Sequence, residues 1–179
     1  MESLLKDLLA LSRIGRVVSP PTQVSFVTIA HKAVELLEGA IREKGVHVSI
    51  APHMPTVNAD HIRIREAVTN LVENAIKFMG DQPAPAIEIG MRKDDNLPVF
   101  FVKDNGIGID KKYHEKIFLL FEKLDAKTEG SGAGLTLVKR IIDVQGGRIW
   151  VESEGVGKGS TFCFTLPVVP EGPTDPVKS

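Results

Sequence analysis

The chain has 179 residues, 42% of them hydrophobic, and this length suits one compact domain with short appendages. A formal charge of −1 and the lack of a dense run of Lys and Arg disfavour binding to nucleic acid or to an anionic membrane. No run of eighteen apolar residues and no secretory leader occurs, so we expect a soluble, cytoplasmic chain. The single cysteine, Cys163, permits no internal disulfide and is expected to be buried.

An amphipathic helix is predicted at the N-terminus, from residue 2 to about residue 18, with Leu4, Leu8 and Leu11 on one seam. A helix of this length is marginal alone, so residues 1–19 are interpreted as the last part of a longer helical element. The alternative is a simple N-terminal arm. Two prolines end the helix, and residues 20–25 are predicted to be a linker.

The remainder alternates between helical and strand periodicity. In chain order it predicts a helix over 26–44, a strand over 46–50, a helix from Asp60 to Phe78, strands over 87–91 and 99–102, a short helix over 110–117, a helix from about 134 to 144, and a hairpin of strands over 148–153 and 160–166. Five strands and three main helices fit a two-layer α/β sandwich with the helices on one face of a mixed sheet. The predicted domain covers 26–167, and the tail over 168–179 is expected to be disordered.

The central helix combines a broad apolar face with a polar edge. Asp60 is a good N-cap, and the apolar face comprises Ile64, Ala67, Val68, Leu71, Val72, Ala75, Ile76 and Met79. At about 100° per residue, Asn70, Asn74 and Lys77 fall within roughly 60° of each other beside this face. Because Asn is a mediocre helix former, two of them one turn apart indicate a task other than helix stability. A solvated flank is the alternative.

Two glycine motifs follow buried or amphipathic segments. In the first, Asp104 ends a strand and precedes Gly106 and Gly108, which would allow a flat ligand to approach while the carboxylate accepts a hydrogen bond from an amino group. In the second, alternating glycines over 130–135 precede a helix N-terminus, as in a phosphate cradle. A flexible hinge is the alternative for the second motif. The polar segment 125–129 is expected to belong to a lid.

Two other patterns are set aside. Three histidines, His47, His53 and His61, lack the tight spacing of a metal site. The turn over 155–160 is faintly similar to a P-loop, but Gly159 follows its lysine and no helix comes after it.

Together these motifs resemble the ATP-binding catalytic domain of sensor histidine kinases, within the superfamily that includes gyrase, a heat-shock chaperone and mismatch-repair ATPases. The resemblance covers residues 24–167 and implies a Bergerat-type fold. Four motifs occur in the family's order: an asparagine box over 70–78, a glycine box over 104–108, a phenylalanine box at Phe118 and Phe121, and a second glycine box over 130–135. The closing run 146–153 also looks like this family. Residues 7–13 resemble the end of its second dimerisation helix, particularly in phytochrome-like kinases.

The resemblance implies that the chain binds ATP and Mg²⁺. Asn74 would ligate Mg²⁺, Asn70 and Lys77 would act at the phosphates, and Lys123 would reach the γ-phosphate. The catalytic residues would therefore be Asn70, Lys77 and Lys123. Phe78 would lie by the nucleotide.

The two glycine motifs take roles at opposite ends of the nucleotide. Asp104 would bind the adenine amino group, with Gly106 and Gly108 allowing the base to approach. The residues implied at the phosphates beneath the lid are Ser131, Gly132, Gly134 and Leu135. Phosphoryl transfer suits such a site because it needs charge neutralisation and positioning more than a covalent protein group.

Two departures from the family pattern bear on function. Ala133 stands where the family usually has a larger aliphatic residue, which bears on nucleotide affinity. The phosphoacceptor histidine is missing, because the only matching dipeptide, His114-Glu115, lies between two nucleotide motifs. The chain is therefore expected to donate the γ-phosphoryl of ATP to a histidine on a helix outside it.

Two alternative functions remain. One is a nucleotide-sensing or docking module without catalysis. The other is an ATPase, which is disfavoured because Asn70 stands where the ATPases of the superfamily carry a glutamate. A response regulator is the expected downstream partner. The parent protein is expected to be a homodimer, with any membrane anchor in a sensor region outside this chain, and the fragment itself a monomer or weak dimer.

Overall fold

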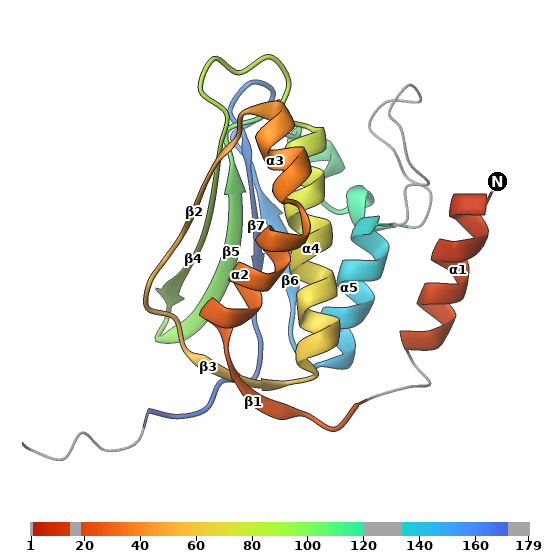
Figure 1. Cartoon of the computed structure of the whole chain (residues 1–179), viewed down its shortest axis with the longest axis vertical. Helices are drawn as coiled ribbons and strands as arrows, with labels where there is room; N and C mark the ends of the chain where they lie inside the picture. The colour runs from red at the N-terminus through yellow and green to blue at the C-terminus, as the bar shows by residue number, and fades with distance from the viewer. Residues whose placement is uncertain (1, 15–18, 120–133, 172–179) are drawn as a thin grey trace, which may run out of the picture.

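The computed structural model describes residues 2–14, 19–119 and 134–171. A five-stranded mixed sheet forms one layer, in the order β2-β4-β5-β7-β6, and helices α2, α4 and α5 lie side by side on one of its faces (Figure 1). The sheet strands are β2 (His47–Ile50), β4 (Ala86–Asp94), β5 (Leu97–Asp104), β6 (Ile149–Glu152) and β7 (Ser160–Phe164). Only β2 and β4 pair in parallel, and the other neighbours are antiparallel. The two-layer α/β sandwich predicted from the sequence is confirmed.

The helices are α1 (Glu2–Ile14), α2 (Phe26–Leu36), α3 (Glu38–Lys44), α4 (His61–Lys77) and α5 (Gly134–Val144). Among the described residues, no helix is both long and apolar enough to cross a membrane. In α4, Asp60 caps the helix as predicted, because its Oδ1 accepts hydrogen bonds from the backbone N–H groups of Ile62 and Arg63. The predicted apolar face of α4 is buried from Ile64 to Met79.

Three aromatic rings hold the two layers together. Phe26 from α2 lies 4.2 Å from Phe100 of β5 and 5.9 Å from Phe164 of β7, measured between ring centroids. All three side chains are at most 1% exposed. Burial of such rings contributes about 1.5–3 kcal/mol each, so this cluster is a main source of sheet-to-helix adhesion.

Several predicted boundaries were wrong. The helix expected over 26–44 is broken at Leu37, whose φ of −109° and ψ of 9° are not helical, so that α2 and α3 are separate. The expected linker over 20–25 contains strand β1 (Thr22–Ser25), which pairs antiparallel with β3 (Thr56–Ala59), a strand that periodicity did not indicate. The short helix expected over 110–117 is two 3-10 turns, η1 (Lys111–Tyr113) and η2 (Lys116–Phe118).

The predicted disordered tail is also ordered at its start. Val168 forms a β-bridge with Val57, and the backbone N–H of Val169 donates to the carbonyl of Thr56 at 2.9 Å. Residues 172–179 lie outside the described residues. The N-terminal helix α1 is described from Glu2 to Ile14, and its predicted end near residue 18 lies outside the described residues. It packs beside α5 through Ala10 and Leu11.

Candidate nucleotide-binding site

The polar edge of α4 meets the start of α5. Asn70 is partly exposed, and its Nδ2 donates to the carbonyl of Glu66 at 2.9 Å, which leaves its Oδ1 to face outward from the helix. A Cβ placed on Gly134 would lie 3.7 Å from this Oδ1. The first residue of α5 is therefore next to Asn70, as a shared phosphate site requires. An N-terminus of this kind favours anions because its N–H groups have no intrahelical partner.

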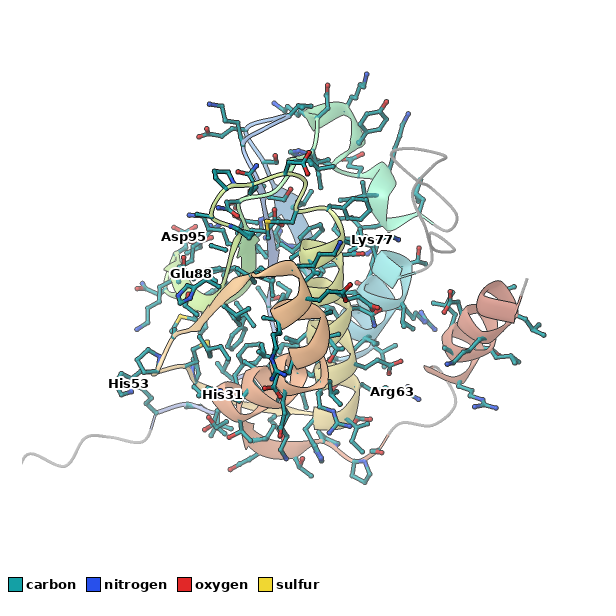
Figure 2. All side chains as sticks on the ribbon, turned by 45° about the horizontal axis from the view of Figure 1, so that its top comes forward. His31, His53, Arg63, Lys77, Glu88 and Asp95 are labelled. Carbon is teal, nitrogen blue, oxygen red and sulfur yellow. The ribbon has the colours of Figure 1, made fainter. Side chains whose placement is uncertain are left out.

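Two further side chains continue this edge toward the C-terminal end of α4. Asn74 is partly exposed, and no hydrogen bond from its side chain to the described residues is present. Lys77 is exposed at the C-terminal end of α4, whereas Arg63 lies at the N-terminal end (Figure 2). The Nζ of Lys77 lies 5.5 Å from the centroid of the Phe78 ring. The helix thus presents amide and ammonium groups in a row, with an aromatic ring after them.

The C-terminal end of α4 is bound to the loop that follows β5. The backbone N–H of Ile107 donates to the carbonyl of Phe78 at 3.0 Å. A Cβ on Gly106 would collide with this same carbonyl and would lie 2.9 Å from Oδ1 of Asp104. Gly106 is therefore required here for close approach of two backbone segments, which is a stronger reason than flexibility.

Asp104 is a buried carboxylate at the end of β5. Its side chain is 7% exposed, and Oδ1 accepts from the backbone N–H of Gly106 at 2.8 Å. Burial raises the pKa of Asp104 to about 6, against the opposing effect of backbone hydrogen bonds from Gly106 and Ser160. A buried carboxylate with a perturbed pKa, held beside a glycine loop, is a candidate for recognising a ligand.

The turn between β6 and β7 supports this loop, and sequence reasoning missed that role. Gly157 N–H donates to Ile107 O at 2.7 Å, and Gly159 N–H donates to Gly106 O at 3.1 Å. Gly108 has a φ of +73°, and a Cβ there would collide with Gly155 O. The alternating glycines rejected as a P-loop therefore hold the Asp104 loop in place. Their spacing was the available signal, although it could not show which loop they contact.

Ser153 completes the same support. Its Oγ accepts from the backbone N–H of Ile109 at 3.0 Å and donates to the carbonyl of Gly159 at 2.7 Å. One hydroxyl therefore connects the Asp104 loop to the turn. Sequence reasoning included Ser153 only as the end of the closing run.

The structure brings together the described members of the predicted site in two groups that α4 connects. One group contains Asn70, Asn74, Lys77 and Gly134, and the other contains Phe78, Asp104, Gly106 and Gly108. Leu135 is partly buried and packs against the core. The residues that lie outside the described ranges are Lys123, Ser131 and Gly132, together with Phe121, Ala133 and the predicted lid.

The His114-Glu115 dipeptide lies between the two 3-10 turns η1 and η2. His114 is anchored to the start of its own segment by a 3.1 Å hydrogen bond between Nε2 and the carbonyl of Ile109. Within the described parts of the chain, no group of three or more His, Cys, Asp or Glu side chains is arranged to hold a metal ion.

Comparison with known proteins identifies the family. The family described as histidine kinase-, DNA gyrase B-, and HSP90-like ATPase matches residues 59–170. The methanogenesis regulatory histidine kinase FilI of Methanothrix harundinacea is 53% identical over 167 residues, which are 93% of this chain and 19% of FilI. Cyanobacterial phytochrome B of Nostoc sp. is 44% identical over 170 residues, 93% of this chain and 22% of the phytochrome. The chain thus spans about a fifth of the length of these relatives.

Solved structures agree in fold. Full-length ShkA in complex with AMPPNP superposes with a TM-score of 0.78 at 29% identity, covering 94% of this chain and 36% of ShkA. The isolated catalytic domain of histidine kinase ThkA gives a TM-score of 0.70 at 29% identity, covering 85% of this chain and all of that domain. The chain therefore belongs to the histidine kinase-, DNA gyrase B- and HSP90-like ATPase family, and its fold is that of histidine kinase catalytic domains.

Proposed function

We propose that this chain transfers the γ-phosphoryl group of ATP to a histidine on a helix outside the chain. The observation that carries this proposal is the proximity of Gly134 to Asn70, since a Cβ on Gly134 would lie 3.7 Å from the Asn70 Oδ1 and the start of α5 therefore lies beside the amide edge of α4. Donors from two helices then converge where phosphates would lie. Transfer of a phosphoryl group needs this kind of charge stabilisation and positioning.

At the phosphate end, the residues fit a magnesium nucleotide. Asn74 would ligate Mg²⁺, since its side-chain amide has no partner among the described residues and amide oxygens suit this hard cation. Mg²⁺, when bound, neutralises charge on the phosphates. Asn70 would donate to or orient the phosphates, and Lys77 would add positive charge. We assign Lys123, Ser131 and Gly132 to the same end on the resemblance alone, because they lie outside the described residues.

At the adenine end, Asp104 would accept a hydrogen bond from the exocyclic amino group. Above pH 6 its carboxylate is ionised, so it is an acceptor only. Gly106 and Gly108 would serve this end by letting the Asp104 loop pack against the Phe78 and Gly155 carbonyls. The Phe78 ring would border the base. Preformed hydrogen bonds from the loop to α4 would keep this end in place before the nucleotide arrives.

The partners proposed for the parent protein follow from its relatives. ThkA has been solved in complex with the response regulator protein TrrA. We propose that the parent of this chain likewise passes its phosphoryl group to a response regulator in the cytoplasm, and that it dimerises through the helical element of which α1 is a part. Residues 1–19 would then belong to the dimerisation region and the residues from β1 onward to the catalytic domain.

The proposal can be tested by calorimetric titration of ATP with and without Mg²⁺. The unaltered chain is expected to bind in a magnesium-dependent manner, Asn74→Ala is expected to abolish the magnesium effect, and Asp104→Asn is expected to weaken binding with or without the metal. Glu73→Ala is the matched control, because Glu73 is exposed and projects about 100° away from Asn74.

Phosphotransfer is then measured in trans, by adding an isolated helical hairpin that carries a phosphoacceptor histidine, together with γ-labelled ATP. The expected product carries a label that is stable to base and labile to acid, as a phosphohistidine is. Magnesium-dependent binding without transfer to the hairpin, under conditions where the hairpin's own kinase labels it, would contradict the kinase assignment. It would favour the nucleotide-sensing module instead.

A further inference from the structure

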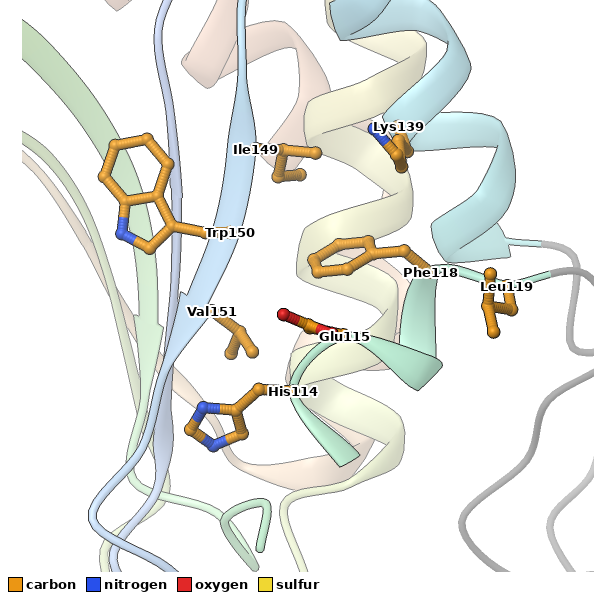
Figure 3. A pocket seen from close by; sticks show the side chains of 8 residues that line it. All are labelled: His114, Glu115, Phe118, Leu119, Lys139, Ile149, Trp150 and Val151. Carbon is orange, nitrogen blue, oxygen red and sulfur yellow. The ribbon is translucent and has the colours of Figure 1, made fainter. Parts of the chain in front are cut away.

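A pocket separate from the nucleotide site lies beside β6, which is an edge strand of the sheet. The pocket has a volume of about 350 Å³ and is bordered by the two 3-10 turns, α5 and β6 (Figure 3). Its apolar wall includes Phe118, Leu119, Ile149 and Val151. Leu119 is 55% exposed. The site proposed for ATP does not use this wall.

The register of the β6–β7 ladder shows which backbone groups face the pocket edge. Thr165 N–H donates to Arg148 O at 2.9 Å, and Ile149 is opposite Phe164. In an antiparallel ladder hydrogen-bonded and non-hydrogen-bonded pairs alternate, so the N–H and C=O groups of Ile149 and Val151 point away from β7. Among the described residues, no strand pairs with this side of β6.

The side chains of β6 lie on both faces of the strand. Ile149 and Val151 point toward Phe118 and the 3-10 turns, whereas Trp150 lies on the other face (Figure 3). A sixth strand added beside β6 would place every second side chain on the pocket side. The pocket is therefore where the helix-facing side chains of an added strand would be accommodated.

The charges around the pocket indicate which side chains an added strand would carry. Glu115 lines the pocket with its carboxylate directed toward β6 (Figure 3), and no ion pair or hydrogen bond joins it to the described residues. Lys139 also lines the pocket, but its Nζ is already paired with Asp143 at 3.0 Å. The unmatched charge in the pocket is negative, and it lies at the Val151 end, opposite the Phe118 and Ile149 end.

We propose that β6 is a docking edge for an extended segment of another protein, which pairs with the outward backbone groups of Ile149 and Val151 and carries an apolar and a basic side chain two residues apart. The apolar side chain would fill the wall at Phe118 and Leu119, and the basic one would meet Glu115. Strand addition of this kind takes affinity from main-chain hydrogen bonds and specificity from alternate side-chain pockets. The proposal does not depend on the proposed phosphotransfer.

The test uses two acetylated, amidated peptides flanked by threonines, with the central triads Lys-Thr-Leu and Leu-Thr-Lys. The first order suits antiparallel pairing with β6 and the second suits parallel pairing. Each is titrated into isotopically labelled protein while backbone amide shifts and hydrogen exchange are followed. At least one peptide is expected to bind and to slow exchange at Ile149 and Val151. Methylation of the peptide amides that pair with β6 is expected to weaken binding by about tenfold or more, because it removes main-chain hydrogen bonds and leaves the side chains.

Charge and shape are tested by substitution. Glu115→Lys is expected to weaken binding by about three- to tenfold, whereas Glu35→Lys, an exposed charge reversal on α2, is expected to leave it unchanged. Leu119→Ser is expected to weaken it as well. The proposal is overturned if neither peptide binds at millimolar concentration, or if the methylated peptides bind equally well. Protection of Ile149 and Val151 without peptide, accompanied by a dimer in sedimentation, would also overturn it and assign the edge to a second copy of the chain.

Discussion

Replacement of Asp104 by asparagine is expected to stabilise the nucleotide-free protein and to weaken ATP binding at the same time. Burial holds the pKa of Asp104 at about 6, compared with 3.8 for an ordinary aspartate. A difference of about two pKa units corresponds to about 3 kcal/mol between the protonation states. Above pH 6 the folded protein therefore holds a carboxylate that burial disfavours, and an amide at the same position would avoid that cost.

The gain should be smaller than the full 3 kcal/mol. The asparagine oxygen can still accept the Gly106 N–H, but its NH₂ group cannot accept the hydrogen bond from the backbone of Ser160. The loss of one such hydrogen bond costs about 1 kcal/mol. We therefore expect Asp104→Asn to raise the free energy of unfolding by about 1–2 kcal/mol at pH 7.5, which for a chain of this size is a rise in Tm of about 2–8 °C.

The pH dependence gives the sign of the effect independently. Because the folded-state pKa is raised, the folded protein binds more protons than the unfolded chain between about pH 4 and pH 6. The contribution of Asp104 to stability is then fully present below pH 4 and is lost as the pH rises through 6. The advantage of the asparagine variant should consequently shrink as the pH is lowered from 7.5 to 4.

Urea denaturation at several pH values, with the nucleotide absent, measures this difference. Asp110→Asn is the matched control, because Asp110 is exposed, accepts one backbone N–H from Lys112, and asparagine can replace it as a cap. Its effect should stay within about 0.5 kcal/mol. An Asp104→Asn variant that is no more stable than the unaltered chain at pH 7.5, or whose advantage does not depend on pH, would refute the argument from burial.

Three further predictions concern other parts of the molecule. Gly106→Ala is expected to lower the free energy of unfolding by about 1–3 kcal/mol in denaturation and to remove ATP binding in calorimetry, because its Cβ would collide with the Phe78 carbonyl; retention of both properties would contradict this. Glu152→Gln is expected to lower the free energy of unfolding by about 0.5–1 kcal/mol at pH 7, because it removes an ion pair with Arg92 that solvent screens. Arg92 holds the pKa of the Glu152 carboxyl at about 2, so this loss should disappear as the pH falls from about 4.5 to 2. Cys163 is fully buried with its pKa raised to about 12, so a thiol reagent should label it only at the rate of unfolding, and immediate labelling of the native chain would contradict its burial.

The parts of the fold that the sequence predicted are those that depend on local periodicity. The apolar face of α4 and the hairpin of β6 and β7 each appear within a single run of residues, so their patterns were sufficient. The pairing of Thr22–Ser25 with Thr56–Ala59 was missed because it joins segments that are far apart in the chain and only four residues long. The break at Leu37 was missed because the apolar spacing continues through it, although Gly39, a poor helix former, lies two residues further on.

In the candidate site, too, the features set by local spacing were predicted and those set by tertiary contacts were not. Helical spacing alone indicated that Asn70 and Asn74 share an edge of α4, and the structure adds Gly134 to that edge. The depth at which Asp104 is buried could not be read from its position at a strand end. It depends on the turn over 155–159, which donates two hydrogen bonds to the loop after β5 from some fifty residues further along the chain. Such support is set by tertiary hydrogen bonds and has no local sequence pattern.

The phosphate end of the proposed site depends on how α4 and α5 are placed relative to each other. That placement is fixed where α4 begins and α5 ends, away from Asn70 and Gly134. Asp60, at the start of α4, is 2% exposed, and its backbone N–H donates to the side chain of Gln145, directly after α5, at 3.0 Å. Its Oδ2 accepts from the backbone N–H of Ser19, in the segment between α1 and β1. A buried polar group of this kind is costly to leave unpaired, so the three segments are held in one arrangement. The contact between Asn70 and Gly134 therefore depends on hydrogen bonds made several turns away, at a point where the chain from α1 enters the domain.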